Sequence, residues 1–171
     1  MIKRREELKI STYDVEQRVF TYSYYVGEAR RNSGTPVQLA ASMQASPDDH
    51  SQMDDHINVA TSELVKIINC NFATCRQMSD NDEEHSGYRI LKFSLTPPQY
   101  FPQSLLCELQ KTMTNYLVMR TIQQWILQHK PDEAAITTTE TEKATIQLRE
   151  LMICRVKPRK IKRDFKNNIE L

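Results

Sequence analysis

Apolar residues recur every three to four positions along most of the chain, which is the pattern of helices that bury one face. The clearest stretch covers residues 48–76, where nearly six turns keep their apolar side chains on one side. Ser46-Pro47 places a capping residue and a first-turn proline at its start. The pattern predicts a helix over residues 48–76 whose buried face includes Ile57, Leu64, Ile68 and Phe72.

The same spacing predicts three more helices. The first begins near Ser11-Thr12, where a hydroxyl side chain can accept hydrogen bonds from the first turn, and runs to about Arg31. A central helix begins near Pro102 and stops at residues 129–131. The fourth runs from about residue 132 to 155, because Pro158 prevents its continuation. The threonine-rich stretch 137–141 has poor helix propensity, so we expect that part to be loose.

Residues 88–95 show the only alternation typical of a strand. Leu91, Phe93 and Leu95 point to one side, and the residues between them point to the other. A single strand cannot satisfy its own backbone groups. It must therefore pair with a second segment of this chain or with another subunit.

These elements predict a mainly α fold: a bundle of about four helices with a small β element at 88–95 and extended termini. A chain of 171 residues fits one domain. We expect a single helical domain over residues 1–156, with a linker at 32–50 that holds at most a short helix at 37–43. An acidic loop is expected at 77–87, and residues 157–171 form a separate basic tail.

Composition narrows the function classes. The chain has only 3 Gly, which disfavours Gly-rich phosphate loops and sheet-rich folds. No apolar run approaches the roughly 20 residues of a membrane span. The charged start, residues 1–7, has no apolar stretch behind it, so we expect no signal peptide and a cytoplasmic site of synthesis. The four cysteines are expected to be free thiols.

No residue pattern indicates catalysis, a cofactor or a metal. Cys70 and Cys75, with His85, are the nearest metal-like set, but a five-residue spacing on a helix puts the two thiols off a common face. The repeated acid-acid-His units at 48–50 and 54–56 are better interpreted as first-turn acids followed by a solvated face. We therefore predict no catalytic residue, no cofactor and no metal site.

Charge is the sharpest feature, because a net charge of +1 hides a strongly basic tail and two acidic stretches. The tail is interpreted as a partner-binding segment, in which apolar residues spaced by four would line one face of a helix formed on docking. Its candidate residues are Arg155, Lys157, Arg159, Lys160, Ile161, Lys162, Arg163, Phe165, Lys166 and Ile169. The possible acidic counter-surface is Asp48, Asp49, Asp54, Asp55, Asp80, Asp82, Glu83 and Glu84.

The second half of the chain resembles a known group of proteins. A long helix carries the segment Tyr116-Leu117-Val118-Met119-Arg120 and then Trp125-Ile126, and a second helix ends in the segment 148–159 with Lys157-Pro158-Arg159. These segments, with those at 10–16 and 87–89, resemble the head-to-tail adaptor and ring proteins of tailed bacteriophages, including crAss-like phages. The resemblance covers residues 10–16 and 87–160.

The resemblance implies a structural virion protein at the head-tail junction or in the tail. Such a subunit forms a homo-oligomeric ring, usually twelvefold, that docks on the portal or on neighbouring ring proteins. Double-stranded DNA passes through the lumen without sequence-specific binding, and no membrane is involved. The alternative is a small helical DNA-binding protein that uses the basic tail on phosphates.

Overall fold

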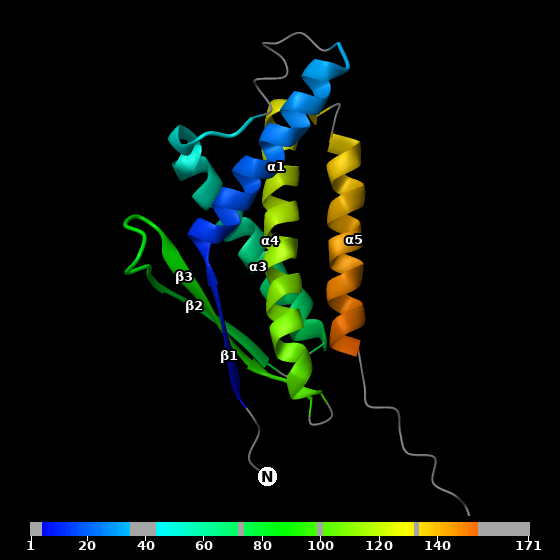
Figure 1. The fold of residues 1–171 in the computed structure, drawn as a ribbon. Coiled ribbons are helices and arrows are strands. Elements are labelled where there is room, and N and C mark those ends of the chain that lie inside the picture. Colours follow the sequence, from blue (N-terminus) through cyan, green and yellow to red (C-terminus); the bar gives the residue numbers. More distant parts are fainter. Residues whose placement is uncertain (1–4, 35–43, 72–73, 99–100, 132–133, 154–171) are drawn as a thin grey trace, which may run out of the picture.

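The computed structural model describes residues 5–34, 44–71, 74–98, 101–131 and 134–153. Within these residues the chain has four α-helices, two short 3-10 helices and one three-stranded antiparallel sheet (Figure 1). The prediction of a mainly α fold with a small β element is confirmed. In chain order the elements are β1 (Glu6–Ser11), α1 (Thr12–Asn32), η1 (Pro47–Asp49), α3 (His50–Asn71), β2 (Thr74–Asn81), β3 (Arg89–Thr96), η2 (Gln103–Leu105), α4 (Leu106–His129) and α5 (Ala134–Ile153).

The predicted strand is β3, and it pairs within the chain on both sides. The strand order is β1-β3-β2, and both pairings are antiparallel. Leu8 and Ile10 of β1 lie opposite Phe93 and Leu91 of β3, and all four side chains are buried. The apolar side of β3 therefore joins the core, as its alternation requires.

The prediction for residues 48–76 is correct for the helix but wrong for its end. The α-helix stops at Asn71, and the chain turns into β2 three residues later. The expected acidic loop at 77–87 is wrong in its first half for the same reason, because residues 77–81 pair with β3. Cys75 fits the apolar spacing of the preceding helix, but the structure places it in β2, where its side chain is buried. In this segment, strand pairing with β3 outweighs the helical pattern of apolar residues, which continues for one turn beyond the observed helix.

Helix α4 lies at the centre of the molecule and contacts α1, α3, α5 and β1 (Figure 1). Its buried residues cover most of its circumference, which explains why its apolar pattern is wider than one stripe. On α3 the predicted core residues Ile57, Leu64 and Ile68 are fully buried. Phe72 lies outside the described residues.

The threonine-rich start of the fourth helix is helical rather than loose. Thr137 and Thr141 are buried, and their hydroxyls donate to the carbonyls of Ala134 and Thr137 at 2.9 and 2.8 Å. Burial and these local bonds offset the poor propensity. None of the helices in the described parts of the chain is long and apolar enough to cross a membrane. The short helix expected at 37–43 lies outside those parts.

Candidate functional site at the acidic end of the sheet

The two acidic stretches meet at one end of the molecule, although about 25 residues of sequence separate Asp55 from Asp80. Arg89, at the start of β3, donates to the carboxylate of Asp54 and, at 2.8 Å, to the side chain of Asn58 on α3. The ring of His50, at the start of α3, lies 4.7 Å from the ring of Tyr88. The beginning of α3 and the turn between β2 and β3 therefore form one surface.

Asp82 holds this turn in place instead of facing a partner. Its side chain is buried, and it accepts a hydrogen bond of 2.8 Å from the Ser11 hydroxyl of β1. It also accepts from the backbone N–H groups of Glu84 and His85 at 3.0 and 3.3 Å. The Ser11 hydrogen bond is the largest cause that lowers the pKa of Asp82. Its assignment to an exposed acidic counter-surface is thus corrected, since the carboxylate is used within the chain.

Four aromatic rings connect three elements at this end. The rings of Tyr13 (α1) and His85 stack 3.8 Å apart with an interplanar angle of 12°. Tyr88 meets Tyr13 edge-on at 5.0 Å and also packs against His50. Aromatic pairs in these geometries add stability beyond the area they bury. The stack fixes the β2–β3 turn against the first turns of α1 and α3.

Glu16 of α1 adds a buried carboxyl group next to these aromatic rings. Its side chain is 1% exposed, and its carboxylate oxygens lie 2.8 and 3.1 Å from Nδ1 of His50. Burial is the largest cause that raises the pKa of Glu16, and the contacts with His50 oppose that rise. This pair joins α1 to the start of α3.

Only half of the eight predicted acids are free of structural roles within the chain. Besides Asp82, Asp49 accepts a 2.9 Å hydrogen bond from the backbone N–H of Ser46, and Asp80 pairs with Lys92 of β3. Asp54 pairs with Arg89, as described above. The four for which the described residues provide no such contact are Asp48, Asp55, Glu83 and Glu84, and all four are exposed, as is Asp80.

A cleft of about 470 Å³ opens beside the turn. Its lining includes acids of the turn, Glu83 and Glu84, and two cations of the sheet, Lys9 and Lys92. Mixed charge of this kind suits a charged protein segment better than an apolar small molecule. The described residues contain no group of three or more His, Cys, Asp or Glu side chains arranged to hold a metal ion. Cys75 is buried, which raises the pKa of its thiol to about 11, whereas Cys70 is exposed.

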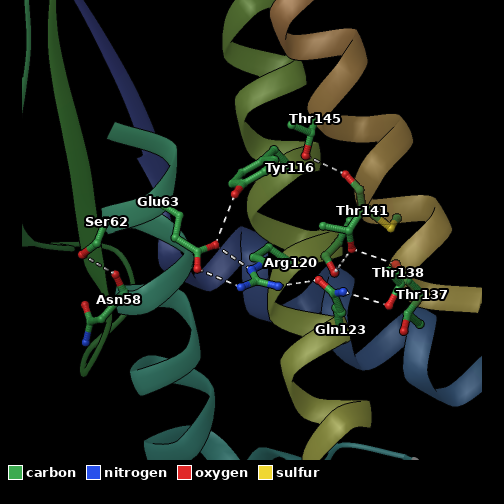
Figure 2. Close-up of polar contacts among 11 residues, drawn as sticks. Asn58, Ser62, Glu63, Tyr116, Arg120, Gln123, Thr137, Thr138, Thr141 and Thr145 are labelled. Carbon is green, nitrogen blue, oxygen red and sulfur yellow. Dashed lines mark hydrogen bonds and ion pairs between the residues drawn. The ribbon is translucent and has the colours of Figure 1, made fainter. Parts of the chain in front are cut away.

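A second polar cluster, missed by the sequence analysis, joins three helices (Figure 2). Arg120 of α4 donates from Nε and Nη2 to the two carboxylate oxygens of Glu63 on α3, at 2.6 and 2.8 Å. Its Nη1 donates to Gln123 at 2.6 Å, and Gln123 donates to Thr138 of α5 at 3.0 Å. The only signal in the sequence was an arginine at an apolar spacing on the central helix.

The side chain of Tyr116 also belongs to this cluster, and all the hydrogen bonds described in it join residues of this chain. Tyr116 lies 3.4 Å from Glu63 through its hydroxyl, and burial is the main reason that its pKa rises to about 12. The hydrogen bond from Arg120 is the largest cause that lowers the pKa of Glu63. We interpret the cluster as a link between helices.

Large apolar side chains also lie outside the core. Tyr24 and Tyr25 on α1 are 52% and 66% exposed. On α5 the exposed large apolar residues are Ile136, Ile146 and Ile153, each more than half exposed. Figure 1 places the end of α1 and the end of α5 at opposite ends of the bundle. The ten predicted tail residues, from Arg155 to Ile169, lie outside the described parts of the chain.

Comparison of the chain with protein-family models, with curated proteins and with solved structures finds no match.

Proposed function

We propose that the protein is a structural virion protein, a subunit of a homo-oligomeric head-to-tail connector or tail ring of a tailed bacteriophage. The observation that carries the proposal is the exposure of large apolar side chains on two separate helices, α1 and α5. Scattered exposed apolar residues are normal, but isoleucines and tyrosines more than half exposed at several places favour burial against another chain.

A ring needs two different surfaces on each subunit, because a head-to-tail contact joins one patch to another. The exposed tyrosines on α1 supply one patch, and Ile146 and Ile153, seven residues apart on one face of α5, supply the other. Tyr24 and Tyr25 lie in the second half of α1, whereas Ile153 ends α5 at the opposite end of the bundle. The occupant we assign to each patch is therefore the other patch of a second copy.

The resemblance to phage ring proteins supports the further details of the proposal. The ring is twelvefold, it docks on the portal or on an adjacent tail ring, and double-stranded DNA passes through its lumen. The basic tail of one subunit docks on the exposed acids at the end of the sheet, Asp48, Asp55, Glu83 and Glu84. The protein acts in the virion and catalyses no reaction.

Mass photometry of the purified protein, followed by electron microscopy of the particles, tests this proposal. The Ile146→Glu variant should lose the ring because a charge enters the contact, while its circular dichroism spectrum stays that of the wild type. The matched control is Gln147→Glu, which adds the same charge at the next exposed position. A protein that is monomeric at every concentration, or an unaffected ring in Ile146→Glu, would contradict the proposal. A monomer whose DNA affinity falls steeply with salt would favour the DNA-binding alternative.

A further inference from the structure

The free edge of β2 is open, in contrast to the other edge of the sheet. At β1, Gln110 of α4 donates from Nε2 to the backbone carbonyl of Lys9 at 2.6 Å, so α4 covers that edge. β2 is the outer strand on the other side. An uncovered edge presents unpaired N–H and C=O groups to any strand of matching length.

The direction of these groups follows from the register of the sheet. The N–H of Asp82 donates to the carbonyl of Tyr88, so the even-numbered residues of β2 direct their backbone groups to β3. The odd-numbered residues direct theirs outward. Cys75 confirms this, because its N–H donates to the side chain of Asn69 at 2.6 Å and not to β3. No other described residue bonds to the outward backbone groups of Gln77, Ser79 and Asn81.

Beyond Cys75, the helices also leave both faces of β2 uncovered. Gln77 and Ser79 lie opposite the buried Phe93 and Leu91, on the face that the helices cover at β3, yet both are exposed. On the other face Met78 is 65% exposed. All six residues from 76 to 81 are exposed, so an added strand meets no side chain that has to leave the core.

The side chains of the outer face are self-complementary. Arg76, Met78 and Asp80 alternate along one side of β2. Charges on an edge strand usually oppose pairing between copies. In an antiparallel register centred on Met78, however, Arg76 of each copy lies opposite Asp80 of the other, and the two methionines meet. Cross-strand pairs of opposite charge stabilise a sheet, and this register provides two of them.

We propose that two copies of this chain pair through β2 in this register and form one continuous six-stranded sheet. The outward groups of Gln77 in each copy bond to those of Ser79 in the other, which gives four main-chain hydrogen bonds around Met78. The ladder ends near Cys75, whose N–H is already bonded to Asn69. The contact is two-fold and closes with two chains. It therefore rests on no part of the proposed ring, whose contacts are head-to-tail.

A single added strand buries less surface than the roughly 1,200 Å² of a standard stable interface. The dimer is therefore expected to depend on protein concentration, and a cross-link across the axis is the sharpest probe. In a non-hydrogen-bonded pair the two Cα atoms lie about 4.5 Å apart, within the range of a disulfide. Met78→Cys is introduced into a chain in which Cys70, Cys75, Cys107 and Cys154 are replaced by Ala or Ser.

Oxidation should convert Met78→Cys to a disulfide-linked dimer about tenfold faster than the matched control Gln77→Cys, because in this register residue 77 faces residue 79 and not itself. Equal rates, or a faster rate in Gln77→Cys, would overturn the proposed register. The cross-link should persist in Ile146→Glu, whose effect is on the ring contact. A dimer that forms only where the ring forms would overturn the separate two-fold contact.

A charge exchange provides the second measurement. Arg76→Asp and Asp80→Arg each place like charges opposite one another in a homodimer, so each variant alone should dimerise about tenfold more weakly in analytical ultracentrifugation. Mixing the two variants in equal amounts should restore the dimer, since each Asp then faces an Arg. Circular dichroism checks that both variants are folded, because Asp80→Arg also loses the contact with Lys92. No restoration in the mixture would overturn the proposal.

Discussion

Arg120 occupies an apolar spacing on the central helix α4, and its charge is matched by the carboxylate of Glu63 on α3. The planar guanidinium pairs with both carboxylate oxygens of Glu63, a geometry that a lysine cannot reproduce. Gln123 then extends the contact to Thr138. Since the side chains of Glu63 and Arg120 are a third or less exposed, the pair is partly shielded from water.

We expect a double-mutant cycle of Glu63→Ala and Arg120→Ala to give a coupling free energy of about 1 kcal/mol at neutral pH. Because Arg120 lowers the pKa of Glu63 in the folded state, this stabilisation is complete above the ordinary carboxyl pKa of about 4.3 and is lost as the pH falls through the lowered folded value. Urea unfolding at a series of pH values measures both effects. Arg149→Ala, exposed on α5, is the control and should change the free energy of unfolding by less than about 0.5 kcal/mol. A coupling that is unchanged in strong acid would contradict the assignment.

At the scale of elements, local signals predicted most helix boundaries well. The predicted start of the first helix at Ser11-Thr12 and the stop of the central helix at 129–131 lie within two residues of the observed ends. Both predictions used residues close in sequence, the Ser11-Thr12 pair and a proline. In the structure the two hydroxyls bond to the β2–β3 region instead, Ser11 to Asp82 and Thr12 to the backbone N–H of Arg89. The alternation at 88–95 was likewise sufficient to predict β3.

The two outer strands could not be predicted as readily, because their pairing depends on contacts distant in sequence. β1 has only two buried apolar residues, Leu8 and Ile10, and β2 has one, Cys75. The end of β2, Ser79 to Asn81, is polar and exposed, so nothing in its side chains distinguishes it from a loop. The contacts of the candidate site could not be predicted for the same reason. Tyr13 and His85, like Asp54 and Arg89, are too far apart in sequence for a local pattern to connect them.

Leu64 tests the assignment of the buried face of α3. It is fully buried in the main core, so Leu64→Ala should lower the free energy of unfolding by about 2–5 kcal/mol through lost burial and a residual cavity. Val59→Ala on the same helix is the control, because Val59 is 47% exposed, and it should change stability by less than about 0.5 kcal/mol. Denaturant melts measure both. Equal losses in the two variants would mean that the buried face is assigned wrongly.

At the scale of the whole molecule, charge is used in two different ways. Inside the chain, acids such as Asp82 and Glu16 fix the sheet and the two helices at one end. At the surface of the same end, Glu83 and Glu84 remain exposed beside the cleft. Exposed acids held on a fixed turn can orient a segment of the opposite charge. The basic residues beyond α5 provide such a chain.

Deleting residues 157–171 is expected to abolish assembly while leaving the helical content and the melting temperature of the isolated subunit nearly unchanged. The reason is that Pro158 separates the tail from α5, which ends at Ile153. Exposed ion pairs contribute little, so the tail's share of the binding energy must come from Ile161, Phe165 and Ile169 entering a groove, with charge setting the fit. Replacing these three residues by Ser should therefore disrupt assembly as deletion does.

Glu83→Gln with Glu84→Gln should slow assembly, because both carboxylates are exposed and their loss leaves Asp82 in place. Mass photometry measures assembly, and a salt-dependent DNA shift is followed in parallel. Normal assembly of the truncated chain would show the tail to be a solvated terminus, and loss of DNA affinity alone would favour phosphate binding.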